Sequence, residues 1–461
     1  MRYLPNSDSD RAAMLKAIGK KDAGELFEPI PAGLRLRERL RLPGPLSEPE
    51  LMEFFEQASR ESARDYVSLL GAGAYAHYRP VVIDALILRG EFLTSYTPYQ
   101  AEISQGNLQT MFEFQTLVAQ LTGMDVANSS LYDGSTAANE AVLMAMRLTR
   151  RERVVIARTV HPEYRQVIAT YLQHQGVEIV EVPYAASGQI DVAALEATLN
   201  DQTAAVVVQS PNFFGALEGW PALADVIHRR GALLVSVVTE PLTLALVKPP
   251  VEADIVCGEA QSFGVPLAFG GPYVGFLATR EQYVRQMPGR LVGETVDTRG
   301  RRGYCLTLAT REQHIRREKA TSNICTSQSL MALNAAIYLC LLGKTGLRAL
   351  AEQNLAKACY AAEELGKVPG ASLPFSAPHF NEFVIKAPSD CGELLAALRE
   401  EKIIGGLPLE RFYPELKDHL LVCVTETVPR RTIERMVEVW HRFGQPVAEP
   451  NADVAAVGLD R

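Results

Sequence analysis

Short apolar runs alternate with helical periodicity through residues 125–279. The apolar runs lie at 154–157, 177–182, 204–209, 233–238, 254–257 and 273–278. Segments with a helical period lie at 135–149, 162–175, 191–199 and 220–230. Continuously apolar strands that alternate with helices are typical of a parallel sheet covered on both faces. The chain is therefore predicted to be an α/β protein with a mostly parallel sheet.

The N-terminal segment has the composition of an extended arm. Ser7-Asp8 predicts a short helix that ends before Gly19, and prolines 29, 31, 43, 45 and 49 follow. Ser47-Glu48-Pro49-Glu50 is a capping-box pattern, which predicts a second helix through Phe55 and Ala58.

A second, smaller unit follows the sheet region. Residues 320–342 predict one long helix, and the patterns beyond it predict helices at 346–366, 391–401 and 430–443 and strands at 380–387 and 419–424. We therefore predict an arm (1–60), a large α/β domain (61–330), a small C-terminal α+β domain (331–445) and a flexible tail (446–461).

Composition excludes several classes of protein. Lys and Arg number 46 against 54 Asp and Glu, a net charge of −8, whereas nucleic-acid binding needs a basic surface. No uninterrupted apolar run reaches the ~18 residues of a membrane span, and the N-terminus lacks a signal-peptide pattern. The seven cysteines form no CxxC pair, as expected for reduced thiols. These features predict a cytoplasmic protein that binds neither membrane nor nucleic acid.

The two-domain layout resembles that of the aminotransferase-like (fold-type I) pyridoxal-phosphate enzymes. Such a site needs a helix N-terminus for the phosphate, an aromatic or His over the ring, an Asp at the pyridine nitrogen and a Lys for the Schiff base. The segment 133–139 opens a helix at the position of the phosphate cup. His161 follows an apolar strand, at the position of the ring-covering residue.

The other two requirements are missing from the sequence. Strand 234–238 contains Ser and Val where the Asp is expected, and no lysine occurs between Lys248 and Lys319. Asp133, as an N-cap, would satisfy the amides that a phosphate needs and would repel its charge. We therefore predict that this chain keeps the fold but binds no cofactor and contains no catalytic residue of its own. His161 is then expected to be a core or interface histidine.

Other motifs have structural interpretations. Gly71-Ala72-Gly73-Ala74-Tyr75-Ala76 matches GxGxxA, but it follows a segment (61–70) that predicts a helix, so we expect a turn and no dinucleotide site. Gly270-Gly271-Pro272 also predicts a turn. HExxH, paired Cys/His ligands and GxSxG are absent from the sequence, so neither a metal site nor a serine hydrolase is expected.

Four long segments closely resemble glycine decarboxylase, the P-protein of the glycine cleavage system. They are GAGAYAHYRP (71–80), residues 95–141 beginning SYTPYQAEISQG, SFGVPLAFGGPYVGF (262–276) and REKATSNICTSQSLMAL (317–333). The resemblance is to the N-terminal half of the long form, or the first (α) subunit of the split form, over about residues 3–445. One position differs from the family pattern: this chain has Ala76 where the family is expected to have Asp.

The resemblance implies an oxidoreductase subunit of the glycine cleavage system that is inactive alone. It implies that pyridoxal phosphate and its lysine belong to a second subunit, which removes the carboxylate of glycine as CO2. The aminomethyl group then passes to the lipoyl arm of the H-protein. In this family the first subunit completes an assembly, expected to be α2β2, and helps to wall the active-site entrance.

Two polar segments are the candidates for that wall. The first comprises Tyr96, Thr97, Tyr99 and Gln100, and the second comprises Thr321, Ser322, Asn323 and Thr326. A packed loop would explain the first equally well, and helix capping would explain the second.

The sequence also allows other interpretations of the basic stretch and of the function of the chain. Arg299, Arg301, Arg302, Arg311, Arg316 and Arg317 either dock an acidic carrier protein or form a solvated face. The chain is alternatively a stand-alone enzyme that binds pyridoxal phosphate at Lys248 or Lys319. A third interpretation is a non-enzymatic, degenerate homodimer that binds an amino acid.

Overall fold

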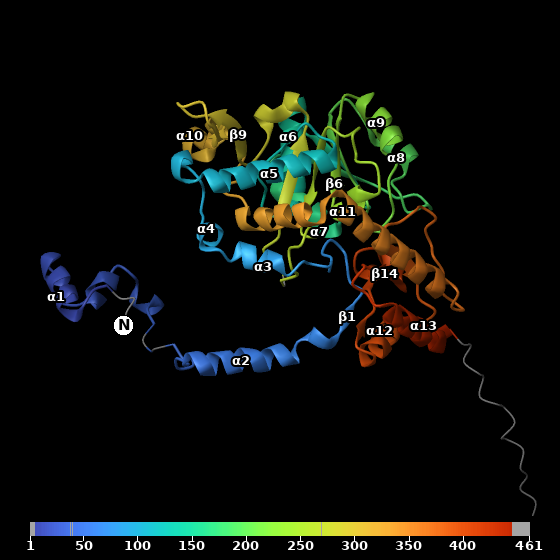
Figure 1. Cartoon of the computed structure of the whole chain (residues 1–461), viewed down its shortest axis with the longest axis horizontal. Helices are drawn as coiled ribbons and strands as arrows, with labels where there is room; N and C mark the ends of the chain where they lie inside the picture. The colour runs from blue at the N-terminus through green and yellow to red at the C-terminus, as the bar shows by residue number, and fades with distance from the viewer. Residues whose placement is uncertain (1–4, 37, 39, 269, 445–461) are drawn as a thin grey trace, which may run out of the picture. The chain divides into compact units, whose positions relative to one another are not determined.

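The computed structural model describes residues 5–36, 38, 40–268 and 270–444. The chain divides into two compact units, residues 1–64 and residues 65–461 (Figure 1). The predicted tail, 446–461, lies outside the described residues. The further division into a large domain (61–330) and a small domain (331–445) stays a prediction.

A seven-stranded sheet forms the centre of the larger unit, in the order β2-β8-β7-β6-β5-β3-β4. Strands β4, β3, β5, β6 and β7 are parallel, whereas β8 pairs antiparallel with both β7 and β2. This confirms the predicted mostly parallel α/β sheet. The strands are β2 (Val126–Ala127), β3 (Arg153–Ala157), β4 (Glu178–Val182), β5 (Thr203–Gln209), β6 (Leu233–Val238), β7 (Ile255–Glu259) and β8 (Gly275–Thr279).

The strands form where the sequence is continuously apolar, because both faces of the sheet are covered. Every residue of β5, β7 and β8 is buried. Gly258 is required within β7, since a Cβ there would lie 1.8 Å from the carbonyl oxygen of Val238 on β6. The helices of this region are α3 (Val82–Ile87), α4 (Gly90–Leu93), α5 (Gln105–Thr122), α6 (Gly134–Thr149), α7 (Pro162–Leu172), α8 (Val192–Thr198), α9 (Trp220–His228) and α10 (Gln313–Arg316).

Helix α11 (Ser329–Gly366) connects the two apolar cores of this unit and lies beside α5 (Figure 1). It is long and apolar enough to cross a membrane by length and composition alone. However, Tyr338 is buried in the core around the large sheet and Leu365 in the second core, which is the packing of a core helix.

Two helix predictions are wrong. Residues 320–328 are not helical, because the amides of Cys325, Thr326 and Gln328 donate to side chains of the 130–132 loop and not to a helix. The end of segment 61–70 is also not helical. Its residues Val67–Ser68 form strand β1, which pairs with β12 (Ile403–Ile404).

The second core lies around a three-stranded antiparallel sheet, β11-β14-β13. Its elements are β11 (Glu382–Lys386), α12 (Cys391–Glu400), β13 (Leu407–Pro408), β14 (His419–Cys423) and α13 (Arg430–Gly444). These match the α+β pattern expected from the sequence. Leu69 is fully buried in this core, so the chain enters it before it enters the large sheet.

A separate hairpin, β9 (Leu291–Val296) and β10 (Arg302–Thr307), contains part of the basic stretch. Arg301 pairs with Asp297 and Arg302 with Glu294, whereas Arg311 donates to backbone carbonyls. The six arginines therefore do not form one uncompensated basic face. Arg299, Arg316 and Arg317 are exposed.

The N-terminal unit contains α1 (Asp8–Ala17) and α2 (Glu48–Glu61), both begun by the predicted serine caps. Two short 3-10 helices lie between them, at Ala23–Phe27 and Ala32–Leu34.

Gly343 interrupts α11 with a backbone conformation of φ +56° and ψ −174°, a region that glycine alone adopts without strain. We expect Gly343→Ala to lower the free energy of unfolding by about 1–3 kcal/mol. Urea unfolding followed by circular dichroism measures this change.

Gly106→Ala, in α5, is the matched control. A Cβ there meets no atom within 4 Å, so alanine should leave stability equal or higher by up to about 1 kcal/mol. Equal effects of the two substitutions would show that the kink at Gly343 imposes no conformational constraint.

Candidate functional site

The carboxyl ends of the parallel strands bring four titratable side chains to one edge of the sheet. Asp133 precedes α6, His161 follows β3, Glu240 follows β6 and Glu259 ends β7. Ligands of open α/β sheets bind at this edge. The site predicted from the sequence is therefore expected at this edge of the sheet.

Two carboxylates occupy the N-terminus of α6. The Oδ1 atom of Asp133 accepts the N–H of Thr136 at 2.8 Å, and Oε2 of Glu259 accepts the N–H of Gly134 at 2.9 Å. Any residue larger than glycine at 134 would meet Tyr164, whose hydroxyl lies 2.1 Å from the Cβ position. The amides that a phosphate would need are thus bonded within the chain, and negative charge lies beside them. The predicted N-cap role of Asp133 is confirmed, whereas the role of Glu259 was not predicted.

Glu259 is buried, and its carboxyl group also accepts the N–H groups of Gln261 and Val274 at 3.0 and 2.8 Å. Burial raises the pKa of Glu259 to about 7, although these backbone donors act in the opposite direction. The group therefore changes its charge near neutral pH.

His161 is covered by the chain itself. Its Nε2 atom donates to the carbonyl oxygen of Ala72 at 2.8 Å, and its Nδ1 accepts the N–H of Glu163 at 3.2 Å. A Cβ on Gly73 would lie 3.1 Å from the imidazole, so segment 72–74 lies directly against this ring. Burial lowers the pKa of His161, so the ring is neutral. His161 is buried, as predicted for a core histidine, and its ring packs near those of Tyr164 and Phe213 while also lining the cavity at the start of α6.

Gln261 lies in the segment after β7 where a Schiff-base lysine was expected. Its amide accepts the N–H of Tyr75 at 2.8 Å and donates to the carbonyl oxygen of Tyr75 at 2.9 Å. The side chain thus fixes segment 71–77 through its backbone. Gly71–Ala76 is a turn, as predicted, and the N–H of Ala72 binds the carboxylate of Glu382 at 2.6 Å.

His77 bridges two buried carboxylates from different sheets. Its Nε2 lies 2.9 Å from Glu240, after β6, and its Nδ1 lies 2.9 Å from Glu426, after β14. Burial opposes the charge on the ring, but the two carboxylates outweigh it and raise the pKa of His77 to about 10. The imidazolium therefore links the large sheet to the small one. Asn381 also donates to Glu240, at 3.0 Å, and Asn354 donates to Glu426, at 2.6 Å.

The first predicted segment is largely exposed. Tyr96 has 82% of its surface exposed and Tyr99 has 59%. Gln100 is exposed, whereas Thr97 is half-buried. Tyr99 is tied to the fold by Arg290, whose Nη2 donates to its hydroxyl at 3.1 Å.

The second predicted segment is extended. Asn323 is exposed and accepts from Gln313, and Thr321, Ser322 and Thr326 are half-buried. Arg290 also donates to the carbonyl oxygen of Cys325 at 2.5 Å, so one buried guanidinium joins both predicted segments. Arg290 is separated from each segment by more than thirty residues, and no sequence motif marked it. Whether these segments wall a partner's active site stays a prediction.

A cavity of about 420 Å³ lies beside the N-terminus of α6, and none of the residues 321–326 lines it. Asp133, His161, Glu163 and Glu259 line one part of it, and Gln328 lines another. The carboxylates give it the wrong charge for an anionic cofactor.

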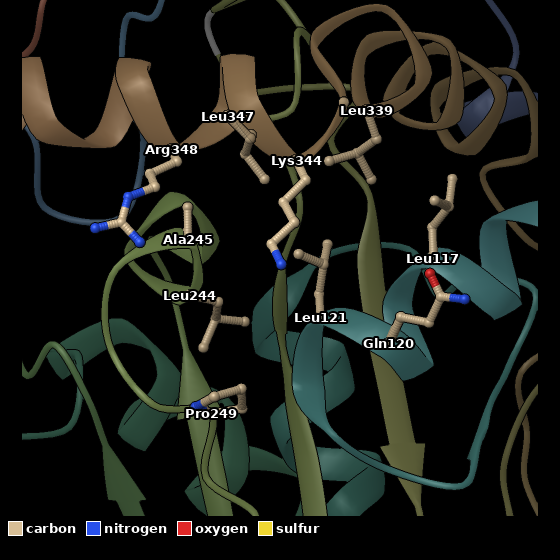
Figure 2. Close-up of a pocket in the computed structure, with 11 residues that line it drawn as sticks. Leu117, Gln120, Leu121, Leu244, Ala245, Pro249, Leu339, Lys344, Leu347 and Arg348 are labelled. Carbon is tan, nitrogen blue, oxygen red and sulfur yellow. The ribbon is translucent and has the colours of Figure 1, made fainter.

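A second cavity, of about 390 Å³, is formed by α5, residues 241–249 and the kink of α11 (Figure 2). Figure 2 shows Lys344 reaching from α11 toward Leu121 and Leu244. Leucine is the commonest residue in its lining, which contains no carboxylate, histidine or thiol. It therefore lacks the acid–base pair that a catalytic site requires.

Within the described residues, no group of three or more His, Cys, Asp or Glu side chains is arranged to hold a metal ion.

Comparisons with known proteins establish the family of the chain. Residues 1–440 match the family model described as glycine cleavage system P-protein. Probable glycine dehydrogenase (decarboxylating) subunit 1 of Koribacter versatilis is 58% identical, over 94% of this chain and 98% of that protein. The protein of the same name from Solibacter usitatus is 54% identical, over 97% and 99%.

Solved structures give the same result. The crystal structure of glycine decarboxylase (P-protein) of the glycine cleavage system, in inhibitor-bound form, is 41% identical, with a TM-score of 0.86 over 96% of this chain and all of that one. Lactobacillus brevis glutamate decarboxylase is 13% identical, with a TM-score of 0.67 over 89% of this chain and 95% of that one, and it shows likeness of fold alone. The fold is that of the fold-type I pyridoxal-phosphate enzymes, as predicted.

The raised pKa of Glu259 predicts a pH dependence of stability. The folded state keeps the proton between about pH 4.5 and 7, where the unfolded carboxyl loses it, so the free energy of unfolding falls as pH rises through this window. Glu259→Gln should remove this part of the slope, up to about 3 kcal/mol. Urea unfolding of both proteins across this pH range measures it.

Glu163→Gln is the control, because Glu163 is an exposed carboxylate that lines the same cavity. It should leave the slope of the wild type unchanged. Parallel pH curves for wild type and Glu259→Gln would contradict the raised pKa.

His77→Gln should lower the free energy of unfolding at pH 7 by about 3–5 kcal/mol, because it leaves two buried carboxylates without their cation. The stabilisation by His77 is fully present below pH 6.5 and is lost as pH rises through about 10. Chemical denaturation at both ends of this range checks the sign.

The matched control is His228→Gln. His228 pairs with Asp254 at 2.8 Å, but 42% of its side chain is exposed, so its loss should cost less than about 1 kcal/mol. A similar cost for the two substitutions would refute the bridging role of His77.

Proposed function

The chain belongs to the glycine cleavage system P-protein family, and on this premise we propose that it is the subunit that binds no cofactor of its own. It is an oxidoreductase component of the glycine cleavage system, a subunit of glycine dehydrogenase (decarboxylating), and its relatives' name, subunit 1, implies a second subunit. The fold and the family fit the use of pyridoxal phosphate by the system.

The proposal rests on which side chains lie at the N-terminus of α6 and after β7, where a cofactor of this fold would bind. Glu259 and Asp133 bind the amides of α6, and segment 72–74 lies against His161. The segment after β7 contains no lysine, and its Gln261 binds the backbone of Tyr75. These residues do not fit pyridoxal phosphate. No chemical step on glycine is therefore assigned to this chain alone, and the cofactor with its lysine belongs to the second subunit.

The proposed contribution of this chain is to complete the assembly and its active-site entrance. The exposed aromatic rings at Tyr96 and Tyr99, and the polar segment 321–326, are the surfaces proposed to face the second subunit's site. Their connection through Arg290 supports a joint role, because one guanidinium orients both. We propose an α2β2 assembly in the cytoplasm.

The lipoyl-bearing H-protein is the proposed acceptor of the aminomethyl group. Arg299, Arg316 and Arg317 remain exposed in the basic stretch and suit an acidic carrier.

The stand-alone alternative has less support from the geometry. Lys248 forms an exposed ion pair with Glu252 at 2.7 Å, and Lys319 is exposed in a 3-10 turn. Neither lysine lines the cavity at the α6 N-terminus.

The test compares this chain alone with this chain plus the second subunit. With pyridoxal phosphate, the isolated chain should develop no borohydride-reducible absorbance band. Glycine–CO2 exchange with the lipoyl carrier should require both subunits. A reducible band in the isolated chain, abolished by Lys248→Ala or Lys319→Ala, would establish the stand-alone alternative.

A further inference from the structure

The N-terminal unit has no buried residue among its described positions, 5–36, 38 and 40–64. Its large apolar side chains are nevertheless numerous and exposed: Met14, Ile18, Leu26, Phe27, Ile30, Leu34, Leu36, Leu40, Leu42, Leu46, Leu51, Met52, Phe54 and Phe55. Exposed apolar side chains that gather on one surface of a soluble protein often mark a binding surface. The segment therefore has the properties of a docking element.

Helix α2 concentrates this surface on one face. Leu51, Phe55 and Ala58 follow the i, i+4, i+7 spacing of one helix face, and Met52 and Phe54 widen it. The rings of Phe54 and Phe55 meet edge to face, with centroids 5.4 Å apart.

Local interactions preform α2 without help from a core. The carboxylate of Glu50 accepts the N–H of Ser47 at 2.7 Å and its hydroxyl at 2.6 Å, and Pro49 lies in the first turn. A helix that is ordered before it binds loses less conformational entropy on binding. Helix α2 is strongly capped, although no residue of its own unit is buried against it. This combination favours a role in binding.

The charges of α2 select the kind of partner. Its polar residues include one basic side chain, Arg60, and five acidic ones: Glu48, Glu50, Glu53, Glu56 and Glu61. Helices that lie on a membrane surface carry Lys and Arg among their polar residues. The acidic polar residues of α2 would instead be repelled by an anionic bilayer. A second copy of α2 would bring like charges together, in a chain whose net charge is already −8. The surface complementary to α2 is therefore an apolar groove bordered by basic side chains.

We propose that the N-terminal arm, residues 5–64, docks on the second subunit. In this arrangement the Leu51–Phe55 face of α2 enters an apolar groove that basic residues border. The proposal rests on the proposed function, which supplies the second subunit.

The experiment uses the full chain with the substitutions Leu51→Gln and Phe55→Gln together. Both residues lie on the apolar face, and glutamine keeps the helix propensity high. In the proposed complex both apolar side chains are buried, so replacing them should weaken binding to the second subunit by about a hundredfold. Sedimentation velocity of titrated mixtures measures the dissociation constant, and raising the salt concentration should weaken the wild-type complex.

The matched control exchanges Glu53→Gln and Gln57→Glu on the opposite face, with the same spacing and no change in net charge. It should bind as the wild type does. Thermal unfolding of both variants should equal that of the wild type, since all four positions are exposed.

The outcomes separate this proposal from the proposed function. If the wild-type chain forms no complex with the second subunit, the proposed function fails. If the wild type and the Leu51→Gln/Phe55→Gln variant bind the second subunit equally, only the docking proposal is overturned. If that variant instead dissociates a homodimer of this chain and leaves the affinity for the second subunit intact, the assigned partner is wrong.

Discussion

The ion triad Glu240–His77–Glu426 is the interaction on which the arrangement of the larger unit depends. Burying two ionised carboxylates near each other is costly unless a cation lies between them. The imidazolium of His77 provides that charge, and it comes from a segment that belongs to neither sheet. As a result, segment 71–77 is fixed between the end of β6 and the end of β14. Tyr75 adds a second connection, since its backbone binds Gln261 and its hydroxyl binds Glu382.

Segment 71–77 also lies at the edge of the sheet where open α/β folds bind ligands, because Ala72, Gly73 and Ala74 line the cavity beside α6. The fold still presents a helix N-terminus and a histidine at the carboxyl edge of the sheet. However, segment 72–74 lies against the ring of His161. At the N-terminus of α6, the carboxylate of Glu259 binds an amide that a phosphate would otherwise bind. The amides of Gly134 and Thr136 and the imidazole of His161 are therefore hydrogen-bonded within the chain. The two predicted segments, joined by Arg290, are the surfaces that we propose to face a neighbouring subunit.

The fold was predictable where local signals and burial agree. Strands such as 204–209 are apolar on both faces, and the helix caps at Ser7, Ser47 and Asp133 are encoded within four residues. The prediction failed at 320–328 and 61–70, where pairing with distant residues overrides helical periodicity. Val67 bonds with a strand more than 300 residues away, which no local pattern reveals.

The sequence alone determined that strand 234–238 contains no aspartate and that no lysine lies between Lys248 and Lys319, because residue identity at a position does not depend on the fold. It also determined that Asp133 caps the helix, since an N-cap is a local interaction. Only the tertiary structure decided that Glu259 reaches the same helix, that His77 carries a charge, and that Arg290 joins two segments. These interactions depend on distances and burial between residues far apart in the chain, and the charge of a buried group is set by its neighbours in space.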